Sequence, residues 1–360
     1  MPVSCCKDRF ALSSRPVDEL DKQLLNLIQT EVPVAARPWA ALAAKLGSSE
    51  AEIMQRIGAL KTGRAIRQIS AIFDTQSLGY ESSLVACQCD PHREDEVAAI
   101  ISAHPGVSHN YRRDHVFNLW YTLAVAPTSK LGLAGTIALL HRQTGAISTR
   151  SLPTLHLFKV GVELDVAGTG QAGDKGAIRY DHAQQRAAVP LTDLEINYVR
   201  AMQNDLSVEP EPFVAIAGQL GISLKELQQL TAGMITAGRL RRFSAVLRHR
   251  ELGFSANGMG IWAVPEADVL RVGKQMAAYR AVTHCYRRPT YPDWSYNIFT
   301  MIHTRSREEC HAVVDQIAQE TGITEHGVLF STKEYKKVRV QYFTAAEAEW
   351  EAQHCENRTV

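Results

Sequence analysis

Two short segments of the chain carry histidine, tyrosine and arginine in the same order. They read His-Asn-Tyr-Arg-Arg at 109–113 and His-Cys-Tyr-Arg-Arg at 284–288. If both are strands, alternation places the histidine, the tyrosine and the second arginine of each segment on one face. Arginine offers carboxylates a planar fork and stacks on rings, while histidine exchanges a proton near neutral pH. Such a face suits a flat, aromatic ligand with several negative charges.

More positive charge gathers at 239–250, where five arginines accompany His249. The whole chain of 360 residues nevertheless holds only 39 Lys and Arg against 38 Asp and Glu. This balance argues against a uniformly basic nucleic-acid coat and against a disordered acidic chain. The cations are therefore concentrated in particular places.

The elements that must position these residues occur twice. Residues 67–72 read Arg-Gln-Ile-Ser-Ala-Ile and match Arg-Arg-Phe-Ser-Ala-Val at 241–246, an offset of 174, while 107–113 matches 282–288 at an offset of 175. A single insertion over such a span indicates an internal duplication. The Gly- and Ala-rich residues 166–189 are predicted to link the two copies.

Each copy is predicted to begin with a winged helix-turn-helix. In copy one, apolar residues at helical spacing predict a first helix, Pro38 opens a short second one, and Gly47 ends it. Ser48 and Ser49 signal the start of a third helix, and residues 67–73 follow as the strand of the wing. Copy two repeats this layout within 191–247.

The second part of each copy alternates strands and helices as β-α-β-β-α-β, the ferredoxin-like split motif. Copy one is predicted to place its elements at 83–90, 94–102, 107–113, 117–125, 131–144 and 155–164, and copy two at 258–264, 269–279, 282–288, 295–303, 308–320 and 326–331. The expected fold class is α+β, a tandem duplication of this two-part unit. It resembles the Lrp/AsnC regulators. The expected boundaries are 1–17 (N-terminal tail), 18–80 and 190–254 (winged helices), 81–165 and 255–345 (ferredoxin-like domains), 166–189 (linker) and 346–360 (C-terminal tail).

That resemblance makes a DNA-binding transcriptional regulator the first hypothesis. Duplex binding requires several cations on phosphates and base-reading side chains on one helix. Residues 18–67 hold seven Lys and Arg against six Asp and Glu, and residues 191–242 hold five against six. DNA is therefore a disfavoured partner, and the helices are interpreted as packing modules.

Cysteine usage and hydropathy indicate the compartment. The seven cysteines are odd in number and include no Cys-x-x-Cys pair, so neither a disulfide framework nor a zinc ribbon is predicted. No stretch of 18 or more apolar residues occurs, and the first residues lack the apolar run of a secretory signal. A cytoplasmic protein without a membrane segment is expected.

Longer motifs carry a more specific resemblance. His-Pro-Gly-Val-Ser-His-Asn-Tyr-Arg-Arg-Asp-His at 104–115, with Asn-Leu-Trp-Tyr at 118–121, resembles one subunit type of the siroheme decarboxylases. The partner subunit type is similar to the segments at 242–254, 284–289, 291–297 and 301–303. The resemblance covers nearly all of 18–343 and implies that two homologous subunits are fused here as a pseudo-heterodimer. Whether fused chains pair further into a homo-oligomer stays open.

The resemblance implies removal of two acetate carboxyl groups from siroheme, giving 12,18-didecarboxysiroheme for heme d1 or an alternative heme pathway. Loss of carbon dioxide needs a sink for the leaving electron pair, which protonation of a ring carbon supplies. No cofactor is required and no metal site is predicted, because the iron belongs to the substrate. Histidine is the natural acid. The leading candidates are His284 and His303 in copy two, His249 is the third, and His109 and His115 are their equivalents in copy one.

The remaining site candidates would hold the substrate. The expected carboxylate anchors are Arg242, Arg248, Arg287, Arg288, Arg112 and Arg113. The expected ring-packing and polar contacts are Tyr111, Tyr286, Tyr291, Trp294, Tyr296, Trp120, Asn118 and Asn297. A structural interpretation stays open for Asn118 and Asn297, which could satisfy backbone groups at a strand start. Which copy catalyses also stays open, as does a heme-binding sensor that uses the same pocket without turnover.

Overall fold

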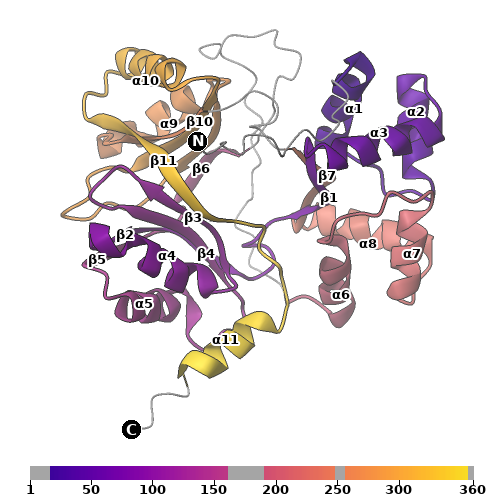
Figure 1. The fold of residues 1–360 in the computed structure, drawn as a ribbon, viewed down its shortest axis with the longest axis horizontal. Helices are drawn as coiled ribbons and strands as arrows, with labels where there is room; N and C mark the ends of the chain where they lie inside the picture. Colours follow the sequence, from indigo (N-terminus) through magenta and orange to yellow (C-terminus); the bar gives the residue numbers. More distant parts are fainter. Residues whose placement is uncertain (1–16, 161–189, 248–255, 356–360) are drawn as a thin grey trace, which may run out of the picture.

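The computed structural model describes residues 17–160, 190–247 and 256–355. Figure 1 shows a helical part beside a part built from sheets and flanking helices, and both copies contribute to each part. The predicted linker at 166–189 and all but the last residue of the predicted tail at 1–17 lie outside the described residues. Within the described ranges, no helix is long and apolar enough to cross a membrane.

The helical part contains one helix-turn-helix from each copy, as predicted. Its helices are α1 (Glu19–Thr30), α2 (Pro38–Leu46), α3 (Glu50–Thr62), α6 (Asp193–Met202), α7 (Pro212–Gln219) and α8 (Leu224–Thr236). Local sequence sets their starts: Asp18, Thr192 and Ser223 form capping boxes at α1, α6 and α8, while proline opens α2 and α7. Gly47 ends α2 with a left-handed φ of 63°.

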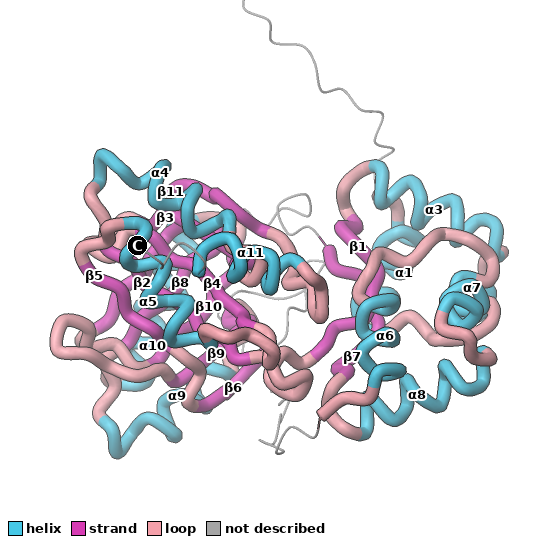
Figure 2. The backbone as a smooth tube through the Cα atoms, turned by 90° about the horizontal axis from the view of Figure 1, so that it is seen from below, coloured by secondary structure: helices cyan, strands magenta, loops and turns pink. Residues whose placement is uncertain are grey.

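The two wings join into one antiparallel ribbon. Strands β1 (Ile66–Phe73) and β7 (Leu240–Leu247) pair with Ser70 opposite Ser244. A single apolar core runs through both helix-turn-helix units, and Trp39 of copy one donates to the Glu209 carbonyl 2.7 Å away in copy two. Figure 2 shows the ribbon on the side of the helical part that faces the strands.

The second part of each copy has the predicted ferredoxin-like order. Copy one supplies β2 (Glu81–Gln88), α4 (Glu94–Ala103), β3 (Val107–Arg113), β4 (Leu119–Val125) and α5 (Gly132–Thr144). Copy two supplies β8 (Ala256–Trp262), α9 (Val269–Ala277), β9 (Val282–Arg287), β10 (Ile298–Thr304) and α10 (Arg307–Thr321). The fold class predicted from the sequence is thereby confirmed.

The final strand of each copy differs from the prediction. In place of one strand at 155–164, copy one has β5 (Ser148–Leu152), which pairs with its own β2, and β6 (His156–Val160), which pairs with β9 of copy two. In copy two, β11 (His326–Lys337) runs past the predicted end at 331 and pairs first with β8 and then with β3 of copy one. The last strand of each copy thus pairs with a strand of the other copy.

This exchange produces one nine-stranded sheet in the order β5-β2-β4-β3-β11-β8-β10-β9-β6. Helices α4 and α5 pack with copy one's strands, and α9 and α10 pack with those of copy two. A separate core contains side chains of both copies, including Trp120, Trp294 and Phe299. The Trp120 and Trp294 ring centroids are 5.3 Å apart. The copy-one and copy-two halves of this sheet are therefore packed against each other through aromatic rings.

A helix occupies the segment expected as a C-terminal tail. Helix α11 (Ala346–Cys355) packs with copy one's sheet core through buried Trp350. The Glu351 carboxylate accepts bonds from the backbone of the loop before α5, at Lys130 (3.0 Å) and Leu131 (3.4 Å). The sequence pattern of α11 is weakly amphipathic, so its docking depends on these tertiary contacts.

Trp350 covers His104, whose side chain is fully buried. The two ring centroids are 4.3 Å apart, and the His104 Nδ1 accepts the Gly106 N–H at 3.0 Å. Burial lowers the pKa of His104 from 6.5 to about 4, and the nearby Lys336 adds to this effect. The folded protein therefore holds His104 neutral down to a lower pH than the unfolded chain does.

We predict that His104 makes stability fall as the pH drops from 6.5 toward 4. In this window the unfolded chain binds a proton that the folded protein excludes, and at pH 5 the cost reaches about 2 kcal/mol. His104→Asn is the matched control, because an Asn oxygen can also accept the N–H two residues on. Denaturant unfolding at pH 7 and pH 5 should show a larger loss for the native chain. Equal losses would contradict the assignment.

Candidate active site

His284 and His303 lie on neighbouring strands of copy two. His284 is on β9 and His303 on β10, as the predicted strand order requires. Both imidazole Nδ1 atoms lie within hydrogen-bonding distance of the Thr283 hydroxyl oxygen, at 2.9 Å for His284 and 3.0 Å for His303. Both side chains are half-buried. The structure thus gathers the two leading acid candidates around one hydroxyl group.

A β-bulge produces this arrangement. On β10, Met301 pairs with His284 and the next residue, Ile302, pairs with Val282. Thr283 is therefore the extra residue of β9 at this bulge. A bulge breaks strict alternation and re-aims a side chain. The Thr283 hydroxyl consequently reaches both imidazoles and the Met301 carbonyl at 3.2 Å.

A cavity of about 560 Å³ opens beside strand β9, which carries His284, although neither histidine is among its lining residues. It is lined by Ile72–Gln76 after the copy-one wing, by Thr154–Leu157 and Val160, and by Arg241 and Tyr286 of copy two, with Ser82. The Tyr286 ring centroid is 6.0 Å from that of His284, and the Val160 backbone pairs with His284. The cavity therefore brings together the wing ribbon, the exchanged strand β6 and the face of β9 that carries His284 and Tyr286.

One ion pair stands at the wing side of this cavity. The Arg241 guanidinium donates to the Asp74 carboxylate at 2.6 Å, and Asp74 also accepts from the Ser77 N–H and hydroxyl, each at 2.8 Å. Burial alone would raise the pKa of Asp74, but the bonds from Arg241 and Ser77 outweigh it and hold that pKa below its usual value. Burial also raises the pKa of Tyr286, so this phenol stays protonated at neutral pH.

Copy one has the same bulge but a different set of side chains. Ser108 lies 3.0 Å from the His109 Nδ1 and 2.7 Å from the Thr122 hydroxyl. Ala124 occupies the position of His303, because its N–H donates to Gly106 as that of His303 donates to Ala281, both at 3.0 Å. Burial, with the charges of Lys337 and Arg67, lowers the pKa of His109 to about 4. Copy one therefore offers one neutral histidine at the place where copy two offers a pair.

Arg113 and Arg288 are buried cross-links between the copies. Arg113 donates to the Leu329 carbonyl of β11 at 2.5 Å, and Arg288 donates to the Leu152 carbonyl of β5, so each reaches a strand of the other copy. Arg288 also lies 4.8 Å from the centroid of the Tyr286 ring. Burial lowers the pKa of both guanidinium groups to about 10. Their Nη1 atoms donate hydrogen bonds to backbone carbonyl groups, and neither arginine lines the cavity.

The other predicted anchors are dispersed. Arg112 pairs with Glu94 at 3.2 Å and Arg287 with Glu266 at 2.6 Å, each with an acid at the start of a flanking helix of its own copy. They therefore lie on the face of the sheet opposite to the histidines. Arg242 is exposed and donates to Ser244 at 3.1 Å. Arg248 and His249 lie outside the described residues.

Most of the predicted aromatic contacts belong to the core between the sheets. His115 lies against Trp294 with ring centroids 5.5 Å apart, and burial lowers the pKa of His115. Trp120 is fully buried, and the Tyr296 ring is 5.1 Å from that of Trp294. Tyr291 donates to the Ser151 carbonyl at 2.5 Å. These side chains hold the two copies together behind the cavity.

The paired asparagines have structural partners. Asn118 accepts from the Cys89 N–H at 3.0 Å and donates to its carbonyl at 3.1 Å. Asn297 does the same with Val264, at 2.9 and 2.7 Å. The structural interpretation that the sequence left open is the one these bonds support. Tyr111 is the copy-one equivalent of Tyr286. Its ring centroid lies 5.9 Å from the Cζ atom of Arg113.

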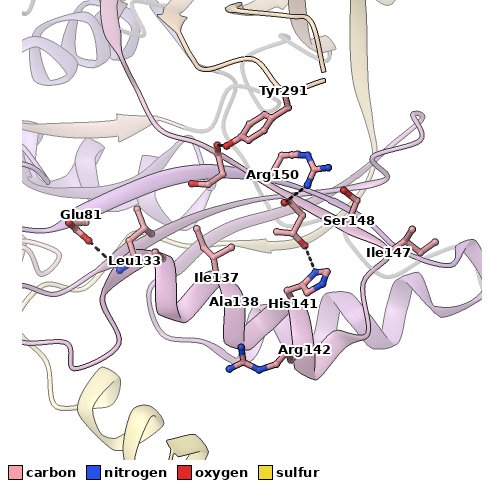
Figure 3. Close-up of a pocket in the computed structure, with 13 residues that line it drawn as sticks. Glu81, Leu133, Ile137, Ala138, His141, Arg142, Ile147, Ser148, Arg150 and Tyr291 are labelled. Carbon is pink, nitrogen blue, oxygen red and sulfur yellow. Dashed lines mark hydrogen bonds between the residues drawn. The ribbon is translucent and has the colours of Figure 1, made fainter. Parts of the chain in front are cut away.

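A second cavity of about 770 Å³ lies along α5 and strand β5 (Figure 3). His141 lines it and bonds the Thr149 hydroxyl at 3.0 Å, and Arg150 pairs with Asp293 at 2.8 Å. Tyr291 is the only predicted site residue on its wall. Neither β9 nor β10 contributes to its lining, whereas Tyr286 of β9 lines the first cavity, so the second cavity is the weaker candidate for the chemistry.

Thr283, Arg241 and Asp74 were missed as site residues from the sequence. Alternation turns Arg241 and Arg242 to opposite faces of β7, and only the pairing of the wings decides which of them meets the cavity. Thr283 is re-aimed by a bulge that no residue pattern announces. Asp74 had one signal, an Asp at the end of a wing strand followed by Ser77 in a turn-like sequence.

Comparison with known families places both parts of the chain. Residues 77–159 and 251–336 match the family described as AsnC-like ligand binding domain. Residues 21–67 match the family described as siroheme decarboxylase NirDL-like HTH domain. The two copies of the sheet part thus match one and the same family, as the duplication requires.

Relatives that align over nearly their own whole length are named siroheme decarboxylase or a subunit of it. A siroheme decarboxylase of Hydrogenobacter thermophilus is 36% identical over 333 residues, which cover 92% of this chain and 97% of that one. A siroheme decarboxylase beta subunit of Methanosarcina barkeri is 40% identical over 147 residues, 41% of this chain and 97% of the subunit. The crystal structure of the siroheme decarboxylase NirDL in co-complex with an iron-uroporphyrin III analogue superposes with a TM-score of 0.74 at 31% identity, covering 95% of this chain and all of that one. The chain belongs to the siroheme decarboxylase family, in its fused form.

Proposed function

We propose that this protein removes two acetate carboxyl groups from siroheme, giving 12,18-didecarboxysiroheme and carbon dioxide. The observation that carries the proposal is the His284–His303 pair around Thr283, next to Tyr286, which lines a cavity together with the Arg241 cation. The names of the full-length relatives and the tetrapyrrole analogue bound to a structural neighbour support the substrate class.

The chemistry needs protons delivered at two kinds of carbon. Protonation of a ring carbon makes an electron acceptor, and the C–C bonding pair then flows into the ring as carbon dioxide departs. A second proton converts the exocyclic carbon to a methyl group, and the ring carbon returns its proton. Each acetate therefore takes up one proton and releases one carbon dioxide. Two adjacent imidazoles suit this exchange, because each can give and regain a proton near neutral pH.

We propose that copy two supplies the acids and copy one supports them. His303 has no histidine counterpart in copy one, where Ala124 takes its position. Copy one still contributes β6 and the turn after its wing to the cavity wall. The protein itself needs no redox or electrophilic cofactor in this scheme, and the iron arrives with the substrate.

Siroheme presented anaerobically to the purified protein tests the proposal. Mass spectrometry should show the loss of two carboxyl groups. Binding without a mass change would identify a heme-binding sensor, and failure to bind together with retardation of promoter DNA would identify a regulator. Either result would overturn the proposed decarboxylase activity.

We predict that His284→Ala and His303→Ala each lower kcat by about a hundredfold while leaving siroheme binding within about threefold, because a positioned acid contributes on that scale. His141→Ala is the control, since His141 faces the second cavity. Single-turnover product formation measures the chemical step. Wild-type rates in both histidine variants would refute the acid assignment.

We predict that Arg241→Gln raises KM about tenfold with little change in kcat, because one charge-assisted contact to a substrate carboxylate is lost. Arg287→Gln on the opposite face of the sheet should leave KM unchanged. Asp74→Asn removes the partner but keeps the cation, so KM should not rise. A rise in Asp74→Asn equal to that in Arg241→Gln would show that the ion pair acts only on structure.

A further inference from the structure

The Thr283 hydroxyl lies within hydrogen-bonding distance of three polar atoms but has a single hydrogen to donate. Its oxygen lies 2.9 Å from the His284 Nδ1, 3.0 Å from the His303 Nδ1 and 3.2 Å from the Met301 carbonyl oxygen. The threonine is 4% exposed, so water does not compete freely for these contacts. A hydroxyl donates one hydrogen and accepts up to two. The protonation states of its neighbours must therefore be consistent with that count.

Only one assignment satisfies all three contacts. A carbonyl oxygen can only accept, so the single hydroxyl hydrogen goes to Met301. The two lone pairs of the hydroxyl then accept one N–H from each imidazole. Both histidines must carry hydrogen on Nδ1, and when neutral each has its lone pair on Nε2.

We propose that Thr283 is a positioning residue that locks His284 and His303 in the Nδ1–H tautomer, so that Nε2 of both rings exchanges protons with the substrate. This inference rests on the proposed function for its role in turnover, but the tautomers exist whether or not turnover occurs. The bulge at Thr283–His284 is what brings the hydroxyl to the histidine side of β9. With Nδ1–H kept in both charge states, each imidazolium gives up its proton from Nε2 and each neutral ring regains it there, as the proton deliveries of each decarboxylation require.

Copy one supplies an internal comparison. Ser108 occupies the equivalent bulge, but it lies between His109 and the hydroxyl of Thr122, which can either donate or accept. The hydrogen count there leaves the tautomer of His109 undetermined. The arrangement that fixes two tautomers at once exists only where His303 joins His284 among the described residues.

The test compares Thr283→Val, which keeps the shape but removes the hydroxyl, with Thr283→Ser, which keeps the hydroxyl. Ser108→Ala is the matched control in copy one. In histidine-labelled protein, ¹H–¹⁵N correlations report the tautomer, and the His284→Gln and His303→Gln variants assign the signals. Wild type, Thr283→Ser and Ser108→Ala should show both rings as Nδ1–H, whereas Thr283→Val should show mixed tautomers. Thermal unfolding checks that each variant is folded.

Turnover gives the second measurement. Thr283→Val should lower kcat about ten- to a hundredfold with KM changed less than about threefold, the scale seen when a group that orients a functional histidine is lost. Thr283→Ser should restore the rate, and Ser108→Ala should keep it. Unchanged tautomers in Thr283→Val, no rescue by serine, or an equal loss in Ser108→Ala would each overturn the proposal. Correct tautomers in a wild-type protein that does not decarboxylate siroheme would instead refute the proposed function alone.

Discussion

The exchange of the last strands between the two copies is the constraint on which the rest of the structure depends. Strand β11 completes copy two's sheet along β8 and then copy one's sheet along β3, while β6 carries copy one's chain to β9. Backbone hydrogen bonding along these strands joins the copy-one and copy-two halves of the sheet, and aromatic side chains of both halves pack together. That placement buries Arg113 and Arg288 against carbonyl groups of the opposite copy and aligns the wings over the strands. The cavity beside His284 has walls from both copies for the same reason.

Sequence reasoning succeeded where a residue pattern is local or repeated. The offset between Arg67 and Arg241 revealed the duplication, and strand alternation correctly separated His284, Tyr286 and Arg288 from Arg287. It failed where the outcome depends on partners distant in the chain. The pattern at 148–160 does not disclose that β5 and β6 serve different sheets, and that of α11 does not disclose its docking site. A row of arginines likewise cannot show which of them bind backbone.

Duplication inside one chain allows the two copies to differ while keeping the same scaffold. Asn118 and Asn297 hold the preceding strand ends with the same bonds, and Arg113 and Arg288 make the same cross-link in opposite directions. These shared contacts are structural. One difference lies on β4 and β10, where Ala124 stands in copy one at the position of His303 in copy two. The scaffold is thus symmetric although the candidate chemistry is not.

The reach of β11 has a consequence for how the protein is made. Lys337 of β11 pairs with His109 of β3, residues far apart in the sequence, so this pairing forms only after β11 has been synthesised. Until then β3 has an unpaired edge, a feature that favours aggregation. Charged side chains on an edge oppose such association, and Arg112 and Arg113 lie on this strand. The sheet of copy one is therefore completed at β3 only when β11 of copy two becomes available.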